Sequence, residues 1–137
     1  MAANTSPIFS RLGSVSWAAG VTAANTAKDG TGTVNLVFEA DATNGSFLRS
    51  IKCKPLGTNV ASLARFFVNN GSTNTTAANN AFFQDITLPA ITNSETAAQI
   101  DIEIPCFVAL DPGYRVYVVL ATAVSAGWTF TAFGGKY

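Results

Sequence analysis

The chain contains no histidine and only two cysteines, Cys53 and Cys106, among its 137 residues. Enzymes usually take a general base, a metal ligand or an activated nucleophile from histidine, cysteine or clustered carboxylates. Here the acidic residues are few and scattered, and the two cysteines lie far apart in the sequence. The composition therefore argues against an enzyme and against a metal or other cofactor. It favours a protein that works through the shape of its surface.

Charge is also scarce, because only 12% of the residues are charged and the formal net charge is zero. Such a chain lacks the electrostatic attraction that drives binding to nucleic acid or anionic lipid. It also lacks long-range self-repulsion, which makes association between copies easier. No apolar run approaches the ~20 residues of a membrane-spanning helix. We expect neither a nucleic-acid partner nor a membrane partner.

The first residues have neither a basic start nor a continuous apolar stretch, so they do not resemble a secretory signal peptide. We therefore expect synthesis in a reducing cytoplasm, where Cys53 and Cys106 remain thiols. Both lie in apolar surroundings typical of small core residues. A disulfide between them is the less favoured alternative.

Apolar residues recur with a period of two along most of the chain, and this alternation predicts β-strands. The clearest case is residues 100–104, in which isoleucine alternates with Asp101 and Glu103. Thr, Val, Ile and Phe dominate such runs, as expected on a half-buried pleated surface. The predicted strands cover residues 15–21, 32–39, 47–54, 62–68, 82–88, 100–104, 114–120 and 128–131.

Turn signals separate the predicted strands. Asn44-Gly45 is a hairpin signal, and Asp111-Pro-Gly113 predicts a type I or II turn with proline at its second position. Short strands between regular turn signals are typical of antiparallel sandwiches and barrels. The sequence thus predicts an all-β fold, a single antiparallel jelly-roll-like β-sandwich of about eight strands. We expect an extended N-terminal arm over residues 1–12 and the sandwich domain over residues 13–137.

Three polar segments were considered as sites. Asp29-Gly-Thr-Gly32 resembles the nucleophile motif of aspartic proteases, but it occurs once and lacks the supporting pattern, so a turn explains it better. Asp41-Ala-Thr-Asn-Gly45 resembles a calcium loop but lacks the further acidic ligands and the final glutamate. The uncharged loop over residues 69–80 is interpreted as a solvated hairpin tip or, alternatively, as a loop that hydrogen-bonds a partner or a glycan.

Aromatic residues make up 11% of the chain. Several fit inward positions on strands, among them Phe38, Phe47, Trp128 and Phe130. The consecutive pairs Phe66-Phe67 and Phe82-Phe83 cannot both face one core, because successive side chains on a strand point to opposite faces. One member of each pair should lie on the outer face, and we assign Phe67 and Phe83 to it. An apolar outer face on a charge-poor domain predicts homo-oligomers or docking.

The chain opens with Ala3-Asn-Thr-Ser-Pro-Ile-Phe9 and closes with two further characteristic stretches, residues 102–117 and 126–137. The closing stretches contain a Leu-x-Pro-Gly-Tyr turn and a final Gly-Trp…Gly-Gly-x-Tyr strand. Together these stretches resemble the small decoration, or cement, proteins of tailed-bacteriophage capsids.

This resemblance implies a jelly roll or related sandwich, homo-oligomers and a place on the outer capsid surface of the virion. The partners would be the major capsid protein, whose neighbouring subunits it would cement, and the protein itself as a dimer or trimer. We expect Pro7, Ile8 and Phe9 of the arm to make these contacts together with Phe67 and Phe83, because an extended arm can bind in a groove of a neighbour. The other interpretation of the arm is a frayed terminus.

An alternative function is a host-glycan or receptor-binding module of a phage spike or fibre. Small β-sandwiches with asparagine-rich loops serve in this way, and Trp17 or Trp128 could stack on a sugar. The feature that favours this alternative is an exposed tryptophan beside clustered asparagine and aspartate side chains in one pocket.

Overall fold

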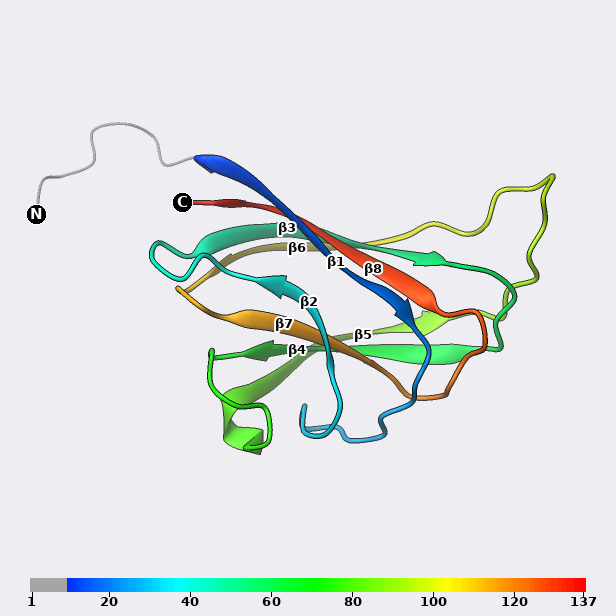
Figure 1. Cartoon of the computed structure of the whole chain (residues 1–137), viewed down its shortest axis with the longest axis horizontal. Coiled ribbons are helices and arrows are strands. Elements are labelled where there is room, and N and C mark those ends of the chain that lie inside the picture. Colours follow the sequence, from blue (N-terminus) through cyan, green and yellow to red (C-terminus); the bar gives the residue numbers. More distant parts are fainter. Residues whose placement is uncertain (1–9) are drawn as a thin grey trace, which may run out of the picture.

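The computed structural model describes residues 10–137 as a sandwich of eight β-strands with one short 3-10 turn, Ala77–Asn79 (Figure 1). The strands are β1 (Leu12–Val21), β2 (Asn35–Glu39), β3 (Ser46–Pro55), β4 (Ser62–Asn69), β5 (Asn80–Leu88), β6 (Ile102–Leu110), β7 (Arg115–Leu120) and β8 (Trp128–Lys136). Every strand predicted from the alternating pattern is present. In the described residues no helix is long and apolar enough to cross a membrane.

The strands form two four-stranded sheets, with the orders β1-β8-β3-β6 and β2-β7-β4-β5. The antiparallel pairing is nested, since β1 pairs with β8, β2 with β7, β3 with β6 and β4 with β5. This is the arrangement of a jelly roll, in which a long ribbon of paired strands folds over into two packed sheets. The predicted antiparallel sandwich is therefore confirmed.

The core lies between the inner faces of the two sheets. Phe38, Phe66, Trp128 and Phe130 are fully buried in it, as the alternation predicted for Phe38, Trp128 and Phe130. Phe66 of β4 and Phe130 of β8 meet edge to face across the sandwich, with ring centroids 5.7 Å apart. Such a contact contributes about 0.5–1.5 kcal/mol beyond the burial of its area. The Phe66–Phe130 contact therefore joins the two sheets near their centres.

The two long edges of the sandwich differ. At one edge, the Ser16 hydroxyl of β1 donates a 2.6 Å hydrogen bond to the Val37 carbonyl of β2 and so links the sheets. At the other edge, β5 and β6 border an apolar cavity of about 300 Å³ whose lining includes Phe83, Ile104 and Cys106. The sandwich is thus linked at the β1–β2 edge and hollowed at the β5–β6 edge.

Phe47 does not lie in the core, contrary to the sequence prediction. Counting back in steps of two from the buried Ile51 and Cys53 would place it inside. However, β3 contains a bulge between Leu48 and Ser50, which shifts the alternation by one residue. Phe47 therefore lies on the outer face of its sheet, where its ring meets that of Phe107 at a centroid distance of 6.5 Å.

Of the two residues assigned to the outer face, Phe67 does not lie on a free surface, whereas Phe83 is 37% exposed at the β5–β6 edge. Phe67 points outward but is fully buried, and it packs edge to face on Phe82 at 5.4 Å. Phe83 is the extra residue of a bulge between β4 and β5. It contacts the core ring of Phe66 and lines the cavity at the β5–β6 edge, so Phe82 is the outward member of its pair.

The long loop between β1 and β2 explains why Phe67 is buried although it points outward from the β2-β7-β4-β5 sheet. It runs along the outer face of the β2-β7-β4-β5 sheet (Figure 1). At one end Ala24 forms a bridge with Leu120, and at the other the Asn80 side-chain amide donates to the Asp29 carbonyl. The β1–β2 loop therefore covers part of the outer face of this sheet.

Two predicted turns have different outcomes. Asp111-Pro-Gly113 forms a type II turn, because Gly113 has φ 77° and the Tyr114 amide donates to the Asp111 carbonyl at 3.1 Å. Asn44-Gly45 is a turn but not a hairpin, since β2 and β3 belong to different sheets. A hairpin signal in the sequence thus marks a connection between the sheets.

Most of the predicted arm, including Pro7, Ile8 and Phe9, lies outside the described residues. Of its last three residues, Leu12 already opens β1 opposite Lys136, and the Arg11 amide donates to the Lys136 carbonyl. The β-structure therefore begins slightly before residue 13, where the sequence predicted the domain to start.

Candidate docking surface

The start of β1 lies beside the end of β8 in the β1-β8-β3-β6 sheet (Figure 1). At this end the outer face of the sheet carries a cluster of apolar and mostly aromatic side chains. We call this cluster the aromatic face. Its residues are Val15, Trp17, Phe47, Phe107, Phe133 and Tyr137.

Strand register brings these residues together from four separate stretches of sequence. Val15 of β1 lies opposite Phe133 of β8, and Phe47 of β3 lies opposite Gly135 of β8. Residues directly opposite each other in a sheet have side chains on the same face, as do residues two apart on one strand. Trp17 therefore shares the face with Val15.

A groove of about 630 Å³ lies in this face, lined by Ser10, Val15, Phe47, Arg49, Phe133, Gly134 and Tyr137. Beside the groove, Gly13 and Gly135 face each other across β1 and β8, and the Ser10 side chain lies against Gly135. A Cβ atom added at Gly13 would meet no atom within 4 Å. The volume lies in the range of ~300–1,000 Å³ that is usual for small-ligand pockets. The groove is thus large enough for a few apolar side chains.

The aromatic face is unusually open to solvent for its composition. Val15 is 53% exposed, Trp17 61% and Phe107 66%. Single exposed apolar residues are common on soluble proteins, whereas a contiguous group of them marks a contact surface. Burial of such area contributes about 25 cal/mol per Å² removed from water. The face is therefore suited to bind another apolar surface.

Phe107 holds its exposed position at the cost of backbone strain. It has φ 48°, which makes it the one described residue other than glycine with a positive φ. Between the pairs Leu48–Val108 and Ser50–Pro105, β6 has one residue more than β3, and Phe107 lies in this irregularity. The left-handed region costs a residue with a Cβ about 1–2 kcal/mol. Backbone strain and bulges of this kind are enriched at sites of contact and function.

Charged side chains occupy the other half of the same outer face. Lys52 lies opposite Glu103 and forms a 3.3 Å ion pair with Asp101, while the Lys54 ammonium donates to the Gln99 carbonyl. These groups are exposed, so each pair contributes little to stability. An apolar patch with a charged border is the usual anatomy of a protein–protein interface.

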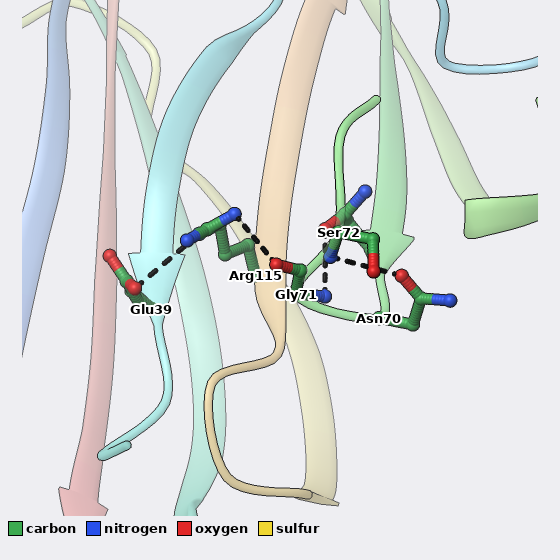
Figure 2. A network of polar contacts seen from close by, with 6 residues as sticks. Glu39, Asn70, Gly71, Ser72 and Arg115 are labelled. Carbon is green, nitrogen blue, oxygen red and sulfur yellow. Dashed lines mark hydrogen bonds and ion pairs between the residues drawn. The ribbon is translucent and has the colours of Figure 1, made fainter. Parts of the chain in front are cut away.

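The polar end of the molecule is organised around Arg115 of β7 (Figure 2). Its guanidinium donates to the Glu39 carboxylate at 3.4 Å and to the Gly71 carbonyl at 3.2 Å. The Ser72 amide in turn donates to the Asn70 side chain at 3.1 Å. Arg115 thus anchors the start of the asparagine-rich loop to the sheet.

Side-chain amides of that loop are largely used within the protein. Asn74 donates to the Gly30 and Gly32 carbonyls of the β1–β2 loop. Asn80 donates to the Asp29 and Asn74 carbonyls, and it accepts a bond from Asn69. The loop over residues 69–80 is therefore held by its own hydrogen bonds, which favours a structural role over a contact role.

Neither acidic motif forms a site with other acidic groups. The pKa of Asp29 is lowered by hydrogen bonds from the Thr31 hydroxyl and amide, and that of Asp41 by the Asn44 and Thr43 amides. Both carboxylates thus close turns. Within residues 10–137 no three His, Cys, Asp or Glu side chains lie together as a metal site.

Cys53 and Cys106 are both free thiols. Burial raises the pKa of Cys53 to about 12, and it also raises the pKa of the half-buried Cys106. Because only the thiolate is a good nucleophile, these shifts suppress reactivity. The cysteines fit the role of small core residues.

Of the predicted contact residues, Phe67 and Phe83 lie outside the aromatic face, and Pro7, Ile8 and Phe9 precede the described part. Val15, Trp17 and Phe47 lie in predicted strands. However, bulges and the pairing of distant strands decide which side chains come together on one outer face, and the sequence does not reveal these. The sequence matches no protein-family model, and searches of curated proteins and of solved structures found no match.

Proposed function

We propose that this protein is a structural virion protein that binds the outer surface of a phage capsid and cements neighbouring major capsid protein subunits. The exposed aromatic face is the observation that carries the proposal. The sequence resemblance to capsid decoration proteins supports it. The jelly roll is an architecture that viral capsid proteins use, although a fold alone does not determine function.

A cementing role needs contact area and shape. Stable interfaces bury about 1,200–2,000 Å² in total, with apolar and aromatic residues at the centre and a polar rim. The aromatic face, with Trp17 and Phe107 exposed and charged residues along its border, has this distribution. An oligomer that binds several capsid subunits at once would gain further affinity, because each later contact forms intramolecularly.

The glycan-binding alternative receives less support. Trp128 is buried in the core. Trp17 is exposed, but the groove in its face is lined by neither asparagine nor aspartate. The clustered asparagines belong to the β4–β5 loop and bond within the protein. A sugar site needs polar groups that converge on the ring, so the aromatic face fits an apolar protein surface better.

Copy number per virion tests the proposal. Purified virions of the phage that encodes the chain would be analysed by quantitative mass spectrometry, with the major capsid protein as the internal standard. We expect hundreds of copies per particle. A handful of copies would overturn capsid cementing in favour of a spike or fibre component, and absence from virions would overturn both.

A further inference from the structure

The β5–β6 edge of the sandwich is open. β5 and β6 are edge strands of different sheets and do not pair with each other. Between them lies the apolar cavity of about 300 Å³ whose lining includes Phe83, Ile104 and Cys106. Packed protein interiors contain few voids larger than a water molecule. A hollow of this size at the edge of the core is therefore a candidate binding site.

The cavity reaches in between the inner faces of the two sheets. Leu48 and Ile104 of one sheet and Val116 of the other line it, and all three belong to the buried core. Val68 and Cys106, which are partly buried, line it too and pack against the same core. A molecule in the cavity would thus contact core side chains of both sheets.

Both strands that border the cavity depart from regular pairing where they line it. Phe83 is the extra residue of the bulge between β4 and β5, and its ring lies 6.3 Å from the core ring of Phe66. In β6 the strained Phe107 lies between Cys106 and Val108, which both line the cavity. Bulges at sheet edges change the direction of side chains and are frequent beside functional sites. These irregularities therefore shape the cavity.

The lining decides which class of molecule fits. No charged side chain of the described residues lines the cavity, so an ionised group buried in it would have no partner. The Cys106 thiol donates to the Ile104 carbonyl at 3.6 Å, and the Gln84 amide nitrogen donates to the Asp85 carbonyl at 3.2 Å. Among the described residues no donor bonds the Gln84 side-chain oxygen. The cavity thus offers apolar walls and one hydrogen-bond acceptor.

We propose that the β5–β6 cavity binds a small, neutral and mostly apolar molecule. An apolar protein cavity of ~150 Å³ holds benzene, so this cavity, of about 300 Å³, suits a molecule of about ten non-hydrogen atoms. Indole has this size, and its N–H group matches the Gln84 oxygen as a donor. The bulged edge is a poor template for pairing with an added strand, which favours a free small molecule over a polypeptide.

This inference goes beyond the proposed function, because the cavity lies between the sheets and the aromatic face lies on the outside of one sheet. A ligand between the sheets would bind the folded chain and not the unfolded chain. It would therefore also stabilise the sandwich at its open edge.

The first test titrates indole into the full chain by isothermal titration calorimetry. Val108→Trp is designed to fill the cavity from its mouth, where Val108 is 37% exposed. Val60→Trp is the matched control, since Val60, like Leu56, is an exposed apolar residue between β3 and β4. We expect saturable binding by the unaltered chain and the control, and at least about tenfold weaker binding by Val108→Trp. Val15→Asp, in the groove of the aromatic face, should bind indole like the unaltered chain.

The second test reports on the cavity of the unaltered chain. Cys106 lines the cavity and is half-buried, whereas Cys53 is fully buried and does not line it. The rate at which N-ethylmaleimide labels each thiol would be followed by mass spectrometry, with Cys53 as the reference for labelling through unfolding. With indole at ten times its dissociation constant, we expect labelling of Cys106 to slow about tenfold, because about one cavity in eleven is then empty.

Four results would overturn the inference. They are an absence of saturable indole binding, equal binding by Val108→Trp, loss of binding in Val15→Asp, and unchanged labelling of Cys106 in the presence of indole. If Val108→Trp does not fold, the labelling of the unaltered chain decides. None of these measurements involves a capsid, so the proposed function and this inference can fail separately.

Discussion

Asn59 shows how one buried side chain holds distant loops together. It is 3% exposed, and its side-chain oxygen accepts bonds of 2.9 and 3.0 Å from the Ala126 and Gly127 amides. Its side-chain amide donates to the Gly127 carbonyl, while its backbone exchanges two hydrogen bonds with Ile91. Its role is not predictable from the sequence, because it is one asparagine among many and its side-chain partners lie more than sixty positions away.

We expect Asn59→Ala to lower the free energy of unfolding by about 2–4 kcal/mol, because it leaves the Ala126 and Gly127 amides without an acceptor and removes one of the two donors to the Gly127 carbonyl. Urea denaturation measures this change. Asn44→Ala is the control, since Asn44 is exposed, and it should change stability by less than about 0.5 kcal/mol. A loss at Asn59 no larger than that of the control would contradict the structural role assigned to it.

Cys53 predicts a pH dependence at the alkaline end. Its pKa is raised from 9.0 to about 12 because burial disfavours the thiolate. Above pH 9 the unfolded chain therefore releases a proton that the folded chain keeps. This thiol thus stabilises the fold fully below about pH 9, and its contribution is lost as the pH rises toward 12, by up to about 1.4 kcal/mol per pH unit.

Denaturation curves between about pH 8 and pH 11, which begin below the unfolded thiol pKa of 9.0 and enter the interval up to about 12, would measure this loss. We expect Cys53→Ala to show a shallower decline in stability over that range than the unaltered chain. Equal slopes for the two proteins would mean that Cys53 ionises alike in both states.

At the scale of strands, alternation located the elements but not always their faces. It placed Trp128 and Phe130 correctly, because β8 pairs with β3 without interruption around them, and the irregularity in the β1–β8 pairing adds its extra residue to β1, between Ala18 and Val21. It failed for Phe47, whose strand contains a bulge. A bulge adds a residue to one partner only, so its presence depends on pairing between distant segments. Sequence alone therefore does not specify it.

The irregularity in β6 leads to a prediction about Phe107. Phe107→Gly removes an exposed ring and also relieves the positive φ, so we expect a change in stability within about 1 kcal/mol. Phe130→Ala, at a fully buried position, should instead cost about 3–5 kcal/mol. Urea denaturation of both variants tests the contrast. A loss of several kcal/mol for Phe107→Gly would show that the ring stabilises the fold rather than serving contact.

At the scale of the whole molecule, the jelly-roll sandwich could be predicted because strand-length runs and turn signals recur along the entire chain. The aromatic face could not, since Val15, Phe47, Phe107 and Phe133 are adjacent only after β1, β3, β6 and β8 have paired. An outer apolar surface is expected from the low charge, and the predicted contact residues Phe67 and Phe83 belong to the other sheet, where Phe83 is exposed and Phe67 is buried. The β1–β2 loop covers the sheet that carries Phe67 (Figure 1).

Binding to capsids tests the central claim most directly. Purified protein would be added to capsids that lack it, and occupancy would be measured by co-sedimentation for the unaltered chain and for Val15→Asp combined with Trp17→Ser. Leu56→Ser combined with Val60→Ser is the control. We expect saturable binding of the unaltered chain and the control, and at least about tenfold weaker binding of the face variant. No binding of the unaltered chain, or equal binding of the face variant, would contradict docking through the aromatic face.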